Sequence, residues 1–183
     1  MKQNIKVSGR VTIQVFDHHG NLKRRPPNFL QRLFRLPGRL MYQHHHNIIT
    51  REGDALIADA LLESPTKPKV KSATGYIQVG TGWTGNNPKA NTRCNTPTGY
   101  PKEIDENYPV LKAAWGSPGD STVIYQATFD PGYLDANNIN EACLLNKSGS
   151  SANCLAYAQI TPQVNVTSND TLQVLWEITI SGQ

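Results

Sequence analysis

Apolar and polar residues alternate along several stretches of this chain, which is the pattern of β-strands with one buried and one exposed face. The strongest example is residues 171–180, whose apolar face is formed by Leu172, Val174, Trp176, Ile178 and Ile180. Residues 10–16 alternate in the same way, with Val11, Ile13 and Val15 on one face. We expect these two strands to share a core with residues 121–130, which contribute Val123, Tyr125, Ala127 and Phe129.

Further short strands are predicted at residues 76–79, 139–145 and 154–160, and the last two flank residues 146–153 as a hairpin. The 14 Gly and 12 Pro residues favour short elements joined by turns. The sequence therefore predicts a mainly β fold: an antiparallel β-sandwich, jelly-roll-like, with one short helix and an N-terminal basic arm. Residues 83–109 are expected to form a long loop, and loops of this length commonly have a function or a partner.

Two segments have the periodicity of amphipathic helices. Residues 50–63 carry an apolar stripe and form the predicted helix of the body, packed at one end of the sandwich. Residues 29–36 follow Asn28, a favourable N-cap, and Pro37 and Gly38 end the helix. Because a helix this short is not stable alone in water, its apolar face must dock on the body or on a neighbour.

The charge of the chain is divided between two regions. Residues 1–51 carry ten Lys and Arg and one acid, for a formal charge of +9, whereas residues 52–183 carry −5, which together give +4. We interpret residues 1–23 as an N-terminal hairpin of the body, residues 24–46 as a basic Pro-containing arm or insertion, and residues 47–183 as the β-sandwich body. Such asymmetry is typical of an arm that binds an anionic surface.

The arm supplies the candidate partner-binding residues, which are Arg24, Arg25, Phe29, Arg32, Leu33, Phe34, Arg35 and Arg39. The spacing of three of these arginines, at 32, 35 and 39, predicts one positive helical face that meets an acidic surface on a neighbouring protein or on the next copy of the chain. Nucleic acid is the alternative partner, but the arm offers few aromatic side chains that could stack on bases.

The sequence contains no nucleophile elbow, P-loop, HExxH or CxxC motif, so we expect neither catalytic residues nor a cofactor. His44 and His46 would share one face of a strand, but a metal site needs a third ligand, and only His18 or His19 remains to supply a histidine. We therefore expect no metal site. The more economical interpretation of residues 44–46 is a polar segment that leads into a strand.

Three cysteines are present, and the first ten residues include no apolar segment of the kind found in signal peptides. This pattern does not favour a disulfide framework or export by a signal peptide. Cys143 and Cys154 lie in the two arms of the predicted hairpin and could come within bonding distance, whereas no partner for Cys94 is evident. No apolar run approaches the length of about 18 residues that predicts a membrane span.

Several short motifs occur in a recognisable order. They are Asp17–Gly20, Asn47-Ile48-Ile49-Thr50, Gly53 with Ala55–Leu62, Gln78-Val79-Gly80-Thr81-Gly82, Ile139-Asn140-Glu141 before an apolar run, and a last strand Thr171–Thr179 that contains Trp176. This order resembles that of small structural proteins of tailed-bacteriophage virions. The resemblance spans most of residues 10–180, and residues 24–46 lie outside it.

The resemblance implies a non-enzymatic virion component that is assembled in the host cytoplasm and joins other virion proteins in the tail, collar or fibre-attachment region. It also implies a homo-oligomer, a ring or a lattice. One alternative is a capsid decoration, or cement, protein. Another is a receptor- or glycan-binding module of the virion, in which Trp83, Tyr100 and Trp115 stack on sugars. A packaged nucleic-acid-binding protein is the third.

Overall fold

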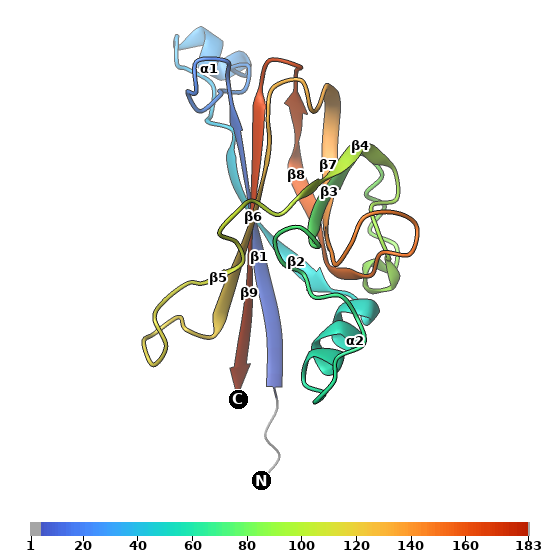
Figure 1. The fold of residues 1–183 in the computed structure, drawn as a ribbon. Coiled ribbons are helices and arrows are strands. Elements are labelled where there is room, and N and C mark those ends of the chain that lie inside the picture. Colours follow the sequence, from blue (N-terminus) through green and yellow to red (C-terminus); the bar gives the residue numbers. More distant parts are fainter. Residues whose placement is uncertain (1–4, 183) are drawn as a thin grey trace.

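The computed structural model describes residues 5–182. Nine strands form one antiparallel sheet in the order β4-β3-β7-β8-β2-β1-β9-β6-β5, and the sheet curls so that its two ends approach each other (Figure 1). The strands are β1 (Ile5–Phe16), β2 (Tyr42–Ile49), β3 (Tyr76–Gly80), β4 (Pro97–Glu103), β5 (Val110–Leu111), β6 (Thr122–Phe129), β7 (Ala136–Leu145), β8 (Cys154–Val166) and β9 (Thr171–Gly182). The predicted mainly β, antiparallel, sandwich-like fold is confirmed.

The core lies on the concave face of the sheet and is centred on Trp176, which is fully buried. In the register of the sheet, Trp176 lies between Val11 of β1 and Tyr125 of β6. Val174 and Leu172 continue this row and are buried, whereas Ile180 near the end of β9 is exposed. The period-two pattern of the sequence thus identified the core and the strands that form it.

Residues 83–109 are not wholly irregular, contrary to the prediction of one long loop. They contain β4, which pairs with β3 at the edge of the sheet, and the short 3-10 helix η1 (Pro88–Ala90). The sequence of β4 gave no strand signal because it contains Pro97, Gly99 and Pro101. An edge strand tolerates proline because one side of its backbone has no partner strand.

The segment before β4 covers the convex face of β3, β7 and β8. We call residues 81–96 the covering loop. Beneath it lies a second, smaller apolar cluster, separate from the main core, with Trp83 and Tyr76 packed against it; its buried members are Cys94, Cys143, Leu145, Ala152, Cys154 and Tyr157. Both faces of the sheet are therefore buried in this region. The main core covers one face, and the covering loop covers the other.

Helix α2 (Arg51–Ala60) confirms the helix predicted for the body. The Thr50 side chain caps it by accepting a hydrogen bond from the Gly53 backbone N–H at 2.9 Å. Gly53 lies against β8, where an added Cβ would come within 2.0 Å of the Leu155 carbonyl oxygen. Leu61 lies within the range predicted for this helix, but the helix ends before it and its side chain is 84% exposed. No helix within residues 5–182 is long and apolar enough to cross a membrane.

Candidate functional site

The segment between β1 and β2 leaves the sheet and forms the most prominent projection of the molecule (Figure 1). The predicted arm, residues 24–46, extends too far towards the C-terminus, because residues 42–46 belong to β2 and pair with β1 in the middle of the sheet. The alternation of apolar and polar residues is not evident in the sequence of this strand, because three successive residues are histidines. The projecting part is residues 17–41, which we call the excursion.

Backbone hydrogen bonds hold the base of the excursion together. Met41 N–H donates to the Lys23 carbonyl at 2.7 Å, and Arg25 N–H donates to the Arg39 carbonyl at 2.8 Å. Gly38 is buried in this stem, where an added Cβ would lie 1.7 Å from the Arg25 carbonyl oxygen. The excursion is therefore a paired ribbon that leads to a defined end, which we call the tip (residues 28–36).

The tip is built around helix α1 (Phe29–Leu33), which is shorter than predicted but begins at the predicted cap. The Asn28 side chain accepts from Gln31 N–H at 2.8 Å, and Gln31 Oε1 accepts from Asn28 N–H at 2.9 Å, which is a reciprocal capping box. Leu36 N–H then returns to the Gln31 carbonyl at 2.7 Å. These local bonds fix the backbone of the tip without contacts to the body.

None of the five residues of α1 is buried. Phe29 is 78% and Phe34 is 67% exposed, and three leucines of the tip, Leu30, Leu33 and Leu36, are exposed as well. The two phenyl rings alone expose roughly 200–350 Å² of apolar surface. The largest apolar patch of a typical monomer measures about 300–600 Å² and is often functional. The tip therefore has the size and composition of an interaction site.

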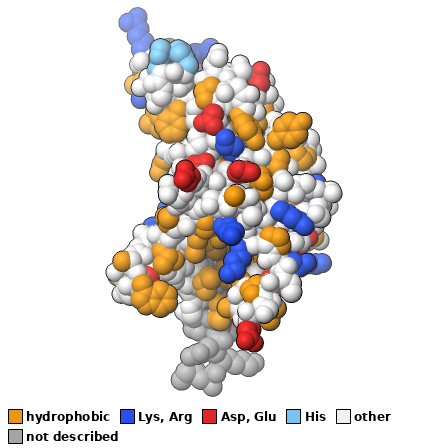
Figure 2. Space-filling view, in the orientation of Figure 1, with side chains coloured by type: hydrophobic (Ala, Val, Ile, Leu, Met, Phe, Trp, Pro, Cys, Tyr) orange, Lys and Arg blue, Asp and Glu red, His pale blue; other side chains and the backbone are white. Residues whose placement is uncertain are grey.

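Basic residues alternate with these apolar residues along the excursion, and some Lys and Arg side chains are visible at its end of the molecule in Figure 2. Arg24, Arg32, Arg35 and Arg39 are exposed, while Arg25 is partly buried and donates to the Pro162 carbonyl at 3.0 Å. The predicted common helical face is wrong, because α1 ends at Leu33 and Arg35 has a positive φ of 52°. Among residues 5–182, the ion pairs of the structure include none of these five arginines. Their charge is available to a partner.

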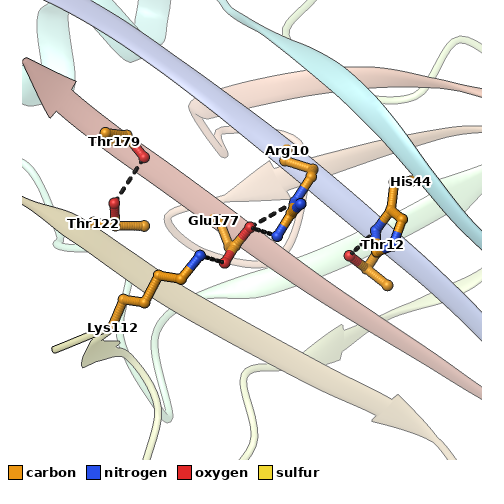
Figure 3. A network of polar contacts seen from close by, with 7 residues as sticks. All are labelled: Arg10, Thr12, His44, Lys112, Thr122, Glu177 and Thr179. Carbon is orange, nitrogen blue, oxygen red and sulfur yellow. Dashed lines mark hydrogen bonds and ion pairs between the residues drawn. The ribbon is translucent and has the colours of Figure 1, made fainter. Parts of the chain in front are cut away.

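The two histidines of β2 that were considered as metal ligands lie on the outer face of the sheet. His44 Nδ1 lies 2.9 Å from Thr12 Oγ1, and no group of three metal-ligating side chains occurs in the described part of the chain. Figure 3 shows that this outer face of the sheet is instead occupied by polar pairs, with Glu177 between Arg10 and Lys112 at 2.6 and 2.7 Å. Burial raises the pKa of Glu177, but the two cations outweigh that effect and hold the pKa below its ordinary value.

A buried carboxylate that the sequence analysis did not single out anchors the covering loop. Glu141 on β7 is fully buried, and its two oxygens accept from the backbone N–H groups of Gly82, Asn95 and Thr96 at 2.9 to 3.0 Å. The Tyr157 hydroxyl donates to the same carboxylate. Burial and this hydrogen bond raise the pKa of Tyr157. Glu141 therefore ties both ends of the covering loop to the sheet.

This arrangement explains why two of the motifs occur together. An added Cβ on Gly80 would lie 2.5 Å from Glu141 Oε1, so only glycine fits beside the carboxylate at this position. The Gly-Thr-Gly segment and the Ile-Asn-Glu segment, which are 59 residues apart at the Gly82–Glu141 bond, form one structural unit. An isolated glutamate before an apolar run was the only sequence signal for it.

The three aromatic residues that were predicted to stack on sugars are in different settings. Trp83 packs on Tyr157 in the outer cluster, with ring centroids 5.0 Å apart. Tyr100 on β4 is 83% exposed, and Trp115 in the loop between β5 and β6 is 89% exposed. The structure therefore leaves two of the three free to meet a ligand and assigns the third to packing.

An open, mostly apolar hollow lies beneath α2. The hollow has a volume of about 200 Å³. Its lining includes Leu56 and Ile57 of the helix together with Val70, Tyr125 and Leu155. Burial raises the pKa of Tyr125 to about 12, so its hydroxyl stays protonated at neutral pH.

Comparison with known proteins adds no relative: no family model, no curated protein and no solved structure matches this chain. The capped tip, with its exposed apolar and basic side chains, is therefore the candidate functional site.

Proposed function

We propose that this protein is a non-enzymatic structural component of a bacteriophage virion, and that its tip joins it to neighbouring virion proteins in the tail, collar or fibre-attachment region. The observation that carries the proposal is the exposure of five apolar side chains on a backbone fixed by its own cap and stem. These side chains remain in contact with water, which is unfavourable for apolar groups, until a partner covers them.

The energetics favour a protein partner for the tip. Burying one Leu or Phe side chain stabilises a complex by about 1.5–3 kcal/mol, and the tip offers five such side chains. Because the capping box already fixes the backbone, little conformational entropy is lost when the tip binds. Phe29 and Phe34 are the expected centre of the contact, since aromatic anchors commonly dominate interface energies.

The arginines around the tip specify the character of that partner. Residues 22–40 contain six Lys and Arg and no acid, and only Lys23 has an ion-pair partner, Asp170. An acidic surface on a neighbouring virion protein, or on the next copy of this chain in a ring or lattice, would match this charge and speed association.

Incorporation into particles tests the proposal. We expect the double substitution Phe29→Ser and Phe34→Ser to leave a folded protein that no longer enters virions. The matched control is Trp115→Ser, which removes an equally exposed aromatic side chain away from the tip and should be incorporated normally. Normal incorporation of the tip variant, with wild-type copy number, would refute the proposed role of the tip.

The exposure of Tyr100 and Trp115 supports a second candidate, a glycan- or receptor-binding module. For that function, particles carrying Tyr100→Ala and Trp115→Ala would assemble but fail to adsorb to host cells. Copy number separates the first proposal from capsid decoration, since a capsid lattice needs hundreds of copies and a neck or tail ring needs few. A structure of the particle in which the arginines face nucleic acid would favour the DNA-binding alternative.

A further inference from the structure

Two cysteines that are distant in the sequence meet in the outer cluster. The Sγ atoms of Cys94, in the covering loop, and Cys143, on β7, are 3.2 Å apart. Both side chains are buried, and both are free thiols. The sequence suggested a different pair, Cys143 with Cys154, because those two share a hairpin.

The surrounding structure fixes the position of both thiols. Gln78 of β3 lies opposite Cys143 in the sheet, and its side-chain Oε1 accepts from Cys94 N–H at 3.2 Å. The Gln78 carbonyl accepts from Cys94 Sγ at 3.4 Å. The next residue, Asn95, is held by Glu141 at 3.0 Å. Cys94 is therefore brought to Cys143 by anchored backbone and not by a chance rotamer.

Cys154 is also close to Cys143, and the two thiols interact, but Cys154 is offset from Cys143 along the strands. In the register of β7 and β8, Cys154 lies opposite Leu145, whereas Cys143 lies opposite Tyr157. The Cys154 thiol donates to the Ala156 carbonyl at 3.2 Å, and its backbone N–H is held by Glu52 of α2 at 2.7 Å. The hairpin pair that the sequence suggested is thus offset along the strands.

We propose that Cys94 and Cys143 are an oxidation site at which a small disulfide, such as oxidised glutathione, closes an intramolecular disulfide bond. Because both thiols are buried, the reaction requires the covering loop to open locally. One thiol then loses its proton and attacks a sulfur of the oxidant, which forms a mixed disulfide and expels a glutathione thiolate. The second cysteine, as its thiolate, then attacks the protein sulfur of that mixed disulfide and releases the second thiolate. The protein loses two hydrogens, and one glutathione disulfide becomes two glutathione thiols.

Closure needs only a small movement, since the sulfurs must approach from 3.2 Å to a bond length of about 2.05 Å. The bond would attach the covering loop covalently to the sheet and restrict the unfolded chain. The reducing cytoplasm would keep the site open. In a virion component, as the proposed function has it, closure would then follow release of the particle from the cell. The chemistry itself does not depend on that function.

The test uses the full chain, purified under reducing conditions and then incubated with excess oxidised glutathione. Mildly alkaline buffer is suitable because burial raises the pKa of Cys94. Burial also raises the pKa of Cys143, but hydrogen bonds from the Cys154 and Cys94 thiols outweigh it and lower that pKa to about 6. Thiols are counted after denaturation, and linked peptides are identified by mass spectrometry. We expect the wild type to fall from three free thiols to one and to yield the Cys94–Cys143 linked peptide.

Two single variants make the assignment specific. Cys154→Ser should fall from two free thiols to none and should melt at a higher temperature after oxidation, with reversal by dithiothreitol. Cys94→Ser should keep both remaining thiols and show no rise in melting temperature. A Cys143–Cys154 linked peptide in the wild type would overturn the proposal. Retention of three free thiols in the folded wild type under these conditions would overturn it as well.

Discussion

The covering loop and the excursion are two irregular segments that leave the same sheet, and they treat their apolar side chains in opposite ways. The covering loop turns back and buries Cys94 against β7, with Trp83 packed on Tyr157. The excursion extends away and leaves Phe29 and Phe34 in solvent. The difference is a polar anchor. Glu141 binds three backbone N–H groups of the covering loop, whereas the side-chain hydrogen bonds of the tip within residues 5–182 are local ones.

The covering loop shows that this chain can bury apolar side chains on the outer face of its sheet, away from the main core. The exposed side chains of the tip are therefore a specific feature of a locally ordered structure and do not reflect a general lack of packing.

The largest expected effect follows from removal of the anchor. Glu141→Ala leaves three backbone N–H groups and the Tyr157 hydroxyl without their acceptor, and we expect a loss of roughly 3–5 kcal/mol in the free energy of unfolding. Urea denaturation measures it. The control is the exposed Glu106→Ala, which should change stability by less than about 0.5 kcal/mol. Equal stability of the two variants would show that the covering loop does not need Glu141.

Removal of an apolar contact from the same loop should have a smaller effect. Trp83→Ala loses the stacked contact with Tyr157 and part of its buried area, so we expect a loss of about 1–3 kcal/mol. Hydrogen exchange should show faster opening of residues 81–96, with the main core unaffected. If exchange rises across β1 and β9 instead, the outer cluster is not a separate unit.

The base of the excursion is sensitive to acid. Burial raises the pKa of Asp170, but the Lys23 ammonium and the Thr167 N–H and hydroxyl outweigh burial and hold the pKa below its ordinary value of 3.8. Because the folded pKa is depressed, this stabilisation is present above the unfolded pKa and is lost as the pH falls through the folded value. Asp170→Asn should cost about 1–2 kcal/mol at pH 7 and should lose less stability than the wild type between pH 7 and pH 3. Parallel pH profiles of the two proteins would contradict this.

The smallest effect on folding is expected at the tip itself. Phe29→Ser with Phe34→Ser should change the free energy of unfolding by less than about 0.5 kcal/mol, because both side chains are mostly exposed. The matched comparison is Trp83→Ala in the covering loop. A loss above about 1 kcal/mol for the tip variant would mean that the tip stabilises the isolated chain, and it would weaken the case for a partner.

The sequence predicted what depends on neighbours along the chain. Strict alternation identified the inward face of β9, and Asn28 identified the start of α1, because period and capping are local properties. The sequence-based prediction failed where contacts between distant parts of the chain determine the local structure. The prolines of β4 concealed an edge strand, and the histidines of β2 concealed a central one. The left-handed backbone at Arg35 removed the predicted row of arginines.

The candidate site could be predicted in composition but not in shape. The apolar and basic residues of the tip were identified from their order in the chain. Their stem depends on hydrogen bonds across the excursion, such as that between Arg25 and Arg39, and no local pattern reports these. The contact between Cys94 and Cys143 spans 49 residues, so spacing in the sequence did not reveal it.

The position of β9 also has a consequence for the order in which the chain can fold. β9 lies between β1 and β6, and its pairing with β1 joins Ile5 to Gly182. During synthesis, one edge of β1 therefore stays unpaired until residues 171–182 have left the ribosome. Strands β5 and β6 stay disconnected from the rest of the sheet for the same period. Such long-range pairing favours slow folding, and a nascent chain that stalls before residue 171 would present an open sheet edge to other chains.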